Sequence, residues 1–268
     1  MATGMLPEDG ELRLGPVTLP SGKRIVPPEG PEVPVAWVTT EAVFYPGLVW
    51  SVLSDMRQET GLVPIVLPYD PNTISSNVCF YLPSSISELD HMDAAQTLAT
   101  LWNGNVSPDD DEFWAAAYAP FSAQFPGLAP PEDARLSEAR LHEVLSALPA
   151  ACIGLVPAQR PADVLPVTGW VGPDCNYPDN LSLATILRSW EDRFGARLLF
   201  IGPSAEIQLL VQRPPRNFES AQRIAAEHFA FCDAFCEDYG KPTRIDRTTI
   251  IDIAPVLVNA PTWSFWWD

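Results

Sequence analysis

An acidic run, "SPDDDEFW" at residues 107–114, is the first stretch whose side chains could do chemistry. Carboxylate oxygens suit hard cations such as Ca²⁺ and Mg²⁺. The same order of residues is also typical of a helix start, because Ser107 suits the N-cap, Pro108 suits the first helical position, and acidic side chains suit the positive end of the helix dipole. The helix start is the simpler explanation, and we predict no metal at this run.

A second candidate metal set consists of His228, Cys232 and Cys236, which follow one another at spacings of four residues. Histidine and cysteine are the ligands that zinc prefers. On a helix, however, the outer two residues lie about 12 Å apart along the axis, too far to share one ion, and the sequence offers no other close Cys and His pair to complete a site with His228 and Cys232. We therefore predict a core histidine with two buried thiols, no metal and no cofactor.

Catalytic motifs are missing from the sequence. It contains no G-x-S-x-G turn, no G-x-G-x-x-G run and no phosphate-binding loop. A cysteine nucleophile with a histidine base is the one catalytic arrangement left, and no motif supports it. We predict no catalytic residue, and the sequence favours a non-catalytic protein over an enzyme.

The stretch "RSWEDR" at residues 188–193 concentrates charge on one helix face. Arg188 and Asp192 stand at i and i+4, with Glu191 beside them, which predicts an ion-paired, solvated surface. A recognition patch is the alternative interpretation. The candidate binding residues of the chain are Arg188, Glu191, Asp192, His228 and Trp266.

The elements that would position these residues occur in two similar series. "PVAWV" at 34–38 and "PVTGWV" at 166–171 are each followed by apolar residues at helical spacing, then by Gly61 or Gly195 and an apolar strand. The likeness predicts an α+β fold of two related units, an internal duplication. The alternative is that any two α+β segments share glycine-capped helices before strands.

Two proline-rich stretches, 16–34 and 156–166, divide the chain. They predict an extended arm over 1–32 without helix or continuous strand, an amino-terminal α+β domain over 33–157 and a carboxy-terminal one over 158–268. Each domain is expected to hold a small, mainly antiparallel sheet covered by helices.

Three elements are predicted in the carboxy-terminal domain. "ARLLFIG" and "EIQLLVQ" flank a short loop and predict a hairpin. Thr249 and Asp252 predict a capping box at a helix start. The final "TWSFWW" alternates as a strand inside a sheet, with Trp263, Phe265 and Trp267 buried on one face, and Trp266 on the other face is expected to contact the amino-terminal domain.

Charge is distributed unevenly. The chain carries a net charge of −18, and residues 1–157 hold 6 Lys and Arg against 20 Asp and Glu, a net charge of −14. This half disfavours nucleic acid and permits a basic protein partner, although solubility alone also explains the acidity. The acidic amino-terminal stretch is not expected to be a signal peptide, and no apolar run is long enough for a membrane helix. With five scattered cysteines, it predicts a cytoplasmic protein whose oligomeric state is open.

At "LRSWEDRFGARLL", "AAEHFAFC" and "WSFWWD" the sequence resembles a bacterial family of domains of unknown function, DUF 4253, which is common in actinobacteria. The resemblance covers the carboxy-terminal domain. It implies an architecture and no activity.

Two hypotheses about function follow. The first is a non-catalytic binding protein, of the inhibitor or immunity type, that presents its acidic half to a basic partner. The alternative is a small-molecule enzyme or ligand-binding protein with its site between the two domains, at Arg188, Glu191, His228 and Trp266.

Overall fold

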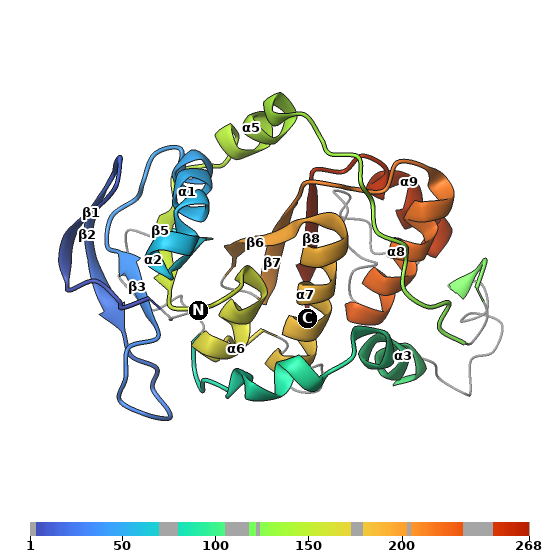
Figure 1. Cartoon of the computed structure of the whole chain (residues 1–268), viewed down its shortest axis with the longest axis horizontal. Helices are drawn as coiled ribbons and strands as arrows, with labels where there is room; N and C mark the ends of the chain where they lie inside the picture. Colours follow the sequence, from blue (N-terminus) through green and yellow to red (C-terminus); the bar gives the residue numbers. More distant parts are fainter. Residues whose placement is uncertain are drawn as a thin grey trace.

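The computed structural model describes residues 4–69, 80–104, 118–121, 124–172, 179–202, 205–232 and 249–267. In this part of the chain the fold is α+β, with one eight-stranded sheet that carries helices (Figure 1). The strands are β1 (Gly10–Leu14), β2 (Val17–Ile25), β3 (Ala36–Thr39), β4 (Val63–Leu67), β5 (Cys152–Val156), β6 (Ala196–Ile201), β7 (Glu206–Val211) and β8 (Thr262–Trp266). The helices are α1 (Pro46–Asp55), α2 (Arg57–Thr60), η1 (Ile86–His91), α3 (Ala94–Gly104), α5 (Glu138–Ser146), η2 (Pro161–Asp163), α6 (Val164–Thr168), α7 (Asn180–Phe194), α8 (Phe218–Phe231) and α9 (Ile250–Leu257).

The strands follow the order β1-β2-β3-β5-β4-β6-β7-β8. Neighbouring strands are antiparallel except β4 and β6, which run parallel and meet at Val66 and Phe200. The mainly antiparallel character is therefore confirmed. The prediction of a separate small sheet in each half is wrong, because the β4 and β6 pair joins the strands of both halves in one sheet.

Helices cover both faces of this sheet, and β4 shows how. Ile65 packs into the core built with α3 and α6–α9, while its neighbour Val66 packs into the core built with α1 and α5. Both faces of β4 are buried, so its side chains do not alternate between apolar and polar. This explains the continuous apolar run "VPIVL".

The predicted glycine caps are confirmed. Gly61 ends α2 and Gly195 ends α7 with positive φ angles of 67° and 61°, and each leads directly into one of the two parallel strands. The wider repeat is not shown, because Trp37 lies in β3 whereas Trp170 follows α6 and forms only an isolated bridge with Phe80. Moreover, β5 pairs with β4, but β8 pairs with β7.

The prediction of a strandless arm is wrong for residues 10–25, which form the β1–β2 hairpin. Pro16 lies in the turn between the two strands. Pro20 lies at an irregularity, since Leu12 pairs with Leu19 while Gly10 pairs with Gly22. The ladder to β3 begins only at Gly22. Proline is tolerated at such a bulge because its missing N–H is not needed there.

The carboxy-terminal elements agree with the sequence. The β6–β7 hairpin, the capping box of Thr249 and Asp252 and the final strand β8 are confirmed. One detail differs: β8 is the last strand of the sheet, not an interior one.

The predicted boundary at residue 157 stays a prediction. Part of the proline-rich stretch forms η2 and α6, in which Ala162, Val164 and Leu165 are buried. These residues pack in the same core as α7.

Candidate functional site

Helix α7 carries most of the candidate binding residues. Asp179 accepts hydrogen bonds from the backbone N–H groups of Leu181 and Ser182 and so caps its start. The predicted apolar face, which includes Ile186, Trp190 and Phe194, is buried against the sheet. The charged residues of "RSWEDR" therefore point away from the sheet.

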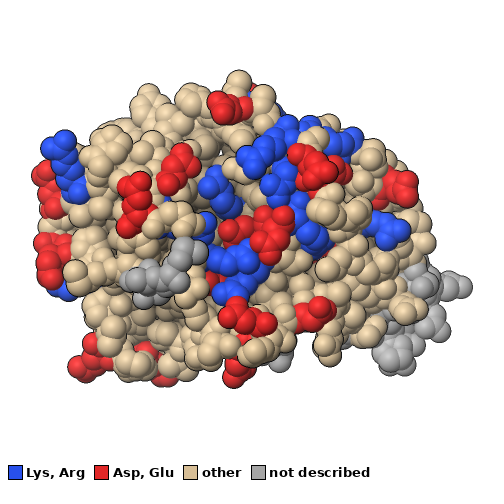
Figure 2. Space-filling model, viewed as in Figure 1, with Lys and Arg blue, Asp and Glu red and all other residues tan. Residues whose placement is uncertain are grey.

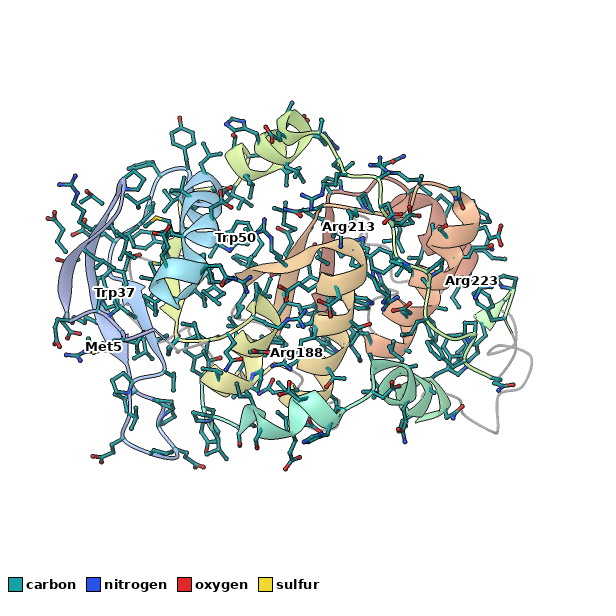
Figure 3. The ribbon with its side chains drawn as sticks, in the orientation of Figure 1. Met5, Trp37, Trp50, Arg188, Arg213 and Arg223 are labelled. Atoms are coloured by element: carbon teal, nitrogen blue, oxygen red, sulfur yellow. The ribbon has the colours of Figure 1, made fainter. Side chains whose placement is uncertain are left out.

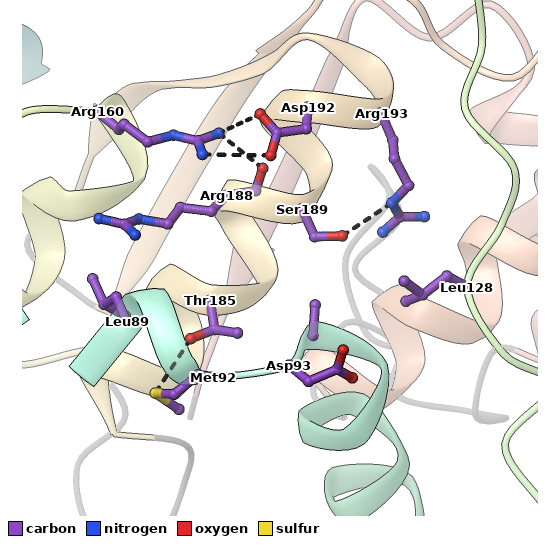
Figure 4. A pocket seen from close by; sticks show the side chains of 11 residues that line it. Leu89, Met92, Asp93, Leu128, Arg160, Thr185, Arg188, Ser189, Asp192 and Arg193 are labelled. Atoms are coloured by element: carbon purple, nitrogen blue, oxygen red, sulfur yellow. Dashed lines mark hydrogen bonds and ion pairs between the residues drawn. The ribbon is translucent and has the colours of Figure 1, made fainter.

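A groove of about 330 Å³ lies along this outer face (Figure 4). It is lined by Leu89, Met92, Asp93 and Ala94 from η1 and the start of α3, by Leu128, by Arg160, and by Thr185, Arg188, Ser189, Asp192 and Arg193 of α7. The groove thus lies where a segment of the amino-terminal half meets the carboxy-terminal half.

Arg188 is mostly buried and links α7 to two carboxylates of other segments. Its Nε donates to Asp163 at 2.6 Å and its Nη1 to Asp90 at 2.9 Å, and Asp163 is fully buried. Figure 3 shows the Arg188 side chain between α7 and the segment of η1. The predicted partner, Asp192, bonds to a different arginine. The predicted ion pairing is therefore confirmed for Arg188, but its predicted partner and solvent exposure are wrong, because η1 and η2 cover this part of the helix face.

Asp192 and Glu191 both bind Arg160, a residue that the sequence did not single out. Arg160 donates to Glu191 at 3.2 Å and to Asp192 at 2.6 Å (Figure 4 draws the second). Burial raises the pKa of Glu191, and the charges of Arg160 and Arg57 oppose that rise. Burial alone would lower the pKa of the Arg160 guanidinium. The charges and hydrogen bonds of Glu191 and Asp192 have the larger effect, so this pKa is raised. No local spacing signals the pair, since 31 positions separate Arg160 from Glu191.

A second unforeseen residue, Glu227 of α8, holds the other end of the groove. Its carboxylate is fully buried and accepts two hydrogen bonds from Arg193, at 2.6 and 2.7 Å. It also accepts from the indole N–H of Trp190 at 2.7 Å and from the backbone N–H of Ala129 at 2.6 Å. The sequence signal is an acidic residue inside an otherwise apolar helix face, beside His228.

His228 and Cys232 lie in the core beneath α7. The His228 ring is fully buried, with the ring centroids of Trp190, Trp263 and Phe265 at 5.0, 4.6 and 4.8 Å. Burial, and then the charge of Arg193, lowers the pKa of His228 well below its ordinary value, so the ring is neutral at pH 7. Cys232 donates to the carbonyl of Trp266 at 3.1 Å. Cys236 and the run 107–114 lie outside the described residues.

We expect chelation to have no effect on stability. Aromatic rings surround His228, and the Cys232 thiol is turned to a backbone carbonyl. Purified protein should therefore contain less than stoichiometric zinc by elemental analysis, and EDTA should leave the melting temperature unchanged. A fall of several degrees with EDTA, reversed by added zinc, would show that these residues bind metal.

Trp266 does not join the other candidates. It is half-buried and does not line the groove. It lies on the face of β8 opposite Trp263 and Phe265, and β7 and β6 separate β8 from β4, about 14 Å away. Strand β8 therefore does not neighbour a strand of the amino-terminal half, and the predicted contact of Trp266 with the amino-terminal domain stays a prediction. Of the five candidates, the structure brings Arg188, Glu191 and Asp192 together around Arg160.

The described side chains of the groove hold one another in place through ion pairs and hydrogen bonds. Arg160, Arg188 and Arg193 each bind at least one carboxylate, and the Ser189 hydroxyl accepts a hydrogen bond from Arg193. Among the described lining residues, no serine or threonine is paired with a histidine or carboxylate base. None of the described helices is long and apolar enough to cross a membrane.

Comparison with known proteins identifies the carboxy-terminal part. Residues 152–268 match the family described as "Domain of unknown function (DUF4253)", which confirms the resemblance seen in the sequence. The matched region includes Arg160 before η2, Glu191 on α7 and Glu227 on α8. No curated protein and no solved structure matches the chain.

Proposed function

We propose that this protein, whose carboxy-terminal part carries the domain of unknown function, is a non-catalytic binding protein. It presents its acidic amino-terminal half to a basic protein partner. The observation that carries the proposal is the exposure of the carboxylates. In the described part of residues 4–157, every Asp and Glu is exposed except Glu132, which is half-buried. Solubility needs exposed charge of either sign, but a one-sided excess creates a field that attracts cationic surfaces.

Charges of opposite sign are unevenly distributed on the molecule. Figure 2 shows most Lys and Arg side chains over the middle and upper right of one face, with some Asp and Glu among them and others along its left and lower margins. We define the acidic margin as Glu11, Glu29, Glu32 and Glu41, all exposed and all close to β1, β2 and β3 in the chain. No ion pair joins these four carboxylates to a described Lys or Arg, whereas nearby Glu8 and Asp9 pair with Arg24.

A cytoplasmic location is part of the proposal. Cys152 is a buried free thiol, as is usual for proteins of reducing compartments. The oligomeric state is left open.

Affinity capture from native lysate at low salt tests the proposal. The full chain is expected to retain a basic protein that elutes as salt rises, because exposed charge pairs are screened by ions. A variant with Glu11, Glu29, Glu32 and Glu41 changed to Gln should lose that protein.

The matched control neutralises four other exposed carboxylates: Glu59, Glu88, Glu138 and Glu219. Both variants carry the same net charge, so a loss confined to the acidic-margin variant would support a specific surface. Equal retention by all three proteins, or retention of no basic protein, would reject the proposal.

The alternative, binding of a small molecule, has one observation in its favour. The groove of about 330 Å³ joins residues 89–94 to α7, between the two predicted domains. A thermal-shift screen of metabolites tests it, since a ligand that binds only the folded state raises the melting temperature. A stabilising compound whose effect disappears in Asp93→Asn would favour this alternative.

A further inference from the structure

Arg197 stands apart from the other arginines of the carboxy-terminal half. It is the second residue of β6, and its guanidinium lies over the ring of Trp50 of α1, 5.1 Å from the centroid. The residue is half-buried. Stacking on an indole favours a cation and holds the guanidinium plane in one orientation.

The guanidinium of Arg197 has no acceptor in the described part of the chain. Its Nε is buried without a hydrogen-bond partner, and no ion pair joins it to a described carboxylate. Arg160, Arg188 and Arg193 each have a carboxylate oxygen within 2.6 Å. Leaving a desolvated charge unpaired costs free energy that a folded chain normally avoids.

Two further arginines act on Arg197 through their charge. Burial lowers the pKa of Arg197, and the charges of Arg57 and Arg135 lower it further, while Asp55 and Glu191 oppose the change. Glu191 is already bound by Arg160, and exposed Asp55 forms no ion pair with a described residue. Arg135 is exposed and forms no ion pair with a described residue either.

We propose that Arg197, together with Arg57 and Arg135, forms a binding site for the oxyanion group of a small ligand, a phosphoryl or carboxylate group. A planar guanidinium donates two parallel N–H groups, which two oxygens of such an anion can accept together. Chloride is spherical and does not match this arrangement. Arg57 of α2 donates to the carbonyl of Gln159 at 3.1 Å and lies 3.9 Å from a carboxylate oxygen of Glu191, and it adds positive charge together with Arg135 from the segment before α5. An anion bound there supplies the acceptor that Arg197 lacks. The site is separate from the acidic margin and does not depend on the proposed protein partner.

Nitrogen-15 NMR of the full chain tests the site. Inorganic phosphate and succinate are titrated separately into the protein at constant pH, with chloride as the reference salt that keeps the ionic strength constant. The arginine Nε–H signals are followed. The Arg197 signal is identified by its disappearance in Arg197→Lys. Saturable shifts of this signal are expected, and whether phosphate or succinate binds more tightly distinguishes a phosphoryl ligand from a carboxylate one.

Three variants make the test decisive. Arg135→Gln changes an exposed residue, so the variant should fold normally. Its affinity for the anion should fall about tenfold, the typical contribution of a charge-assisted hydrogen bond. In Arg197→Lys, which lacks the Arg197 signal, the Nε–H signals of Arg57 and Arg135 should no longer shift saturably with either anion. Arg223→Lys, which alters a half-buried arginine far from Trp50 in Figure 3, should bind as the wild type does.

Asp55→Asn separates the proposal from a simpler explanation. If the site binds an oxyanion, removing the nearby carboxylate should strengthen binding, because it removes a repulsive charge. If Asp55 is itself the partner of Arg197 in solution, Asp55→Asn should instead lower the melting temperature and leave phosphate and succinate without effect. That result, or shifts that do not saturate with either anion in the wild type, would overturn the proposal.

Discussion

Deleting residues 262–268 is expected to unfold the carboxy-terminal half of the protein. The deletion removes β8, which pairs with β7 along Glu206–Leu210. It also removes three buried rings, those of Trp263, Phe265 and Trp267, which are 0, 1 and 3% exposed. Losing one buried tryptophan costs about 3–5 kcal/mol, whereas a whole domain is stable by about 5–15 kcal/mol. Near-ultraviolet circular dichroism and thermal melting measure the effect.

Single substitutions in the same strand provide a matched comparison. Trp263 packs edge-to-face against His228, Trp190 and Phe194, so Trp263→Ala should be severely destabilising, as should Trp267→Ala. Trp266 lies on the opposite, half-buried face and should cost much less when changed to Ala. A truncated protein that stays soluble with an unchanged unfolding midpoint would mean that the strand is not part of the core. Equal costs for Trp266→Ala and Trp263→Ala would contradict the assignment of faces.

Local patterns were sufficient to predict the elements of this region. Alternation in "TWSFWW" predicted the strand and its buried face, because side chains on a strand point to opposite sides in turn. Gly195 predicted the end of α7, because only a residue that tolerates positive φ suits that cap. The capping box of Thr249 and Asp252 followed from hydrogen bonds three residues apart. All of these depend on residues close in sequence.

Pairings between distant segments could not be predicted in the same way. Nothing local to Val66 indicates that its strand lies parallel to that of Phe200, so the single sheet was missed. The arginine partners were missed for the same reason. Asp192 was expected to pair with Arg188 four residues away, but the burial of Asp163 by η2 gave Arg188 a partner in lower dielectric, where an ion pair is stronger. The choice between Asp163 and Asp192 is made by tertiary packing.

Changing Glu227 to Ala is the second substitution expected to have a large effect. The carboxylate is fully buried and accepts from Arg193, Trp190 and Ala129. Without the Glu227 carboxylate, Arg193 loses the partner of its charge, and the N–H groups of Trp190 and Ala129 lose their acceptor. Breaking a buried ion pair by removing one partner costs about 3–5 kcal/mol. Glu219→Ala, an exposed change on the same helix, is the control and should leave the unfolding midpoint in urea nearly unchanged.

A double variant distinguishes the cost of an unpaired charge from the loss of packing. Arg193→Met with Glu227→Leu removes both charges and keeps apolar volume, so it should be less destabilising than Glu227→Leu alone. Full recovery is not expected, because the N–H groups of Trp190 and Ala129 stay without their acceptor. Since Arg193 lines the groove, the pair with Glu227 fixes the position of one groove wall. If Glu227→Ala unfolds at the same urea concentration as Glu219→Ala, Arg193 has another anion in solution, and the groove wall is not held by Glu227.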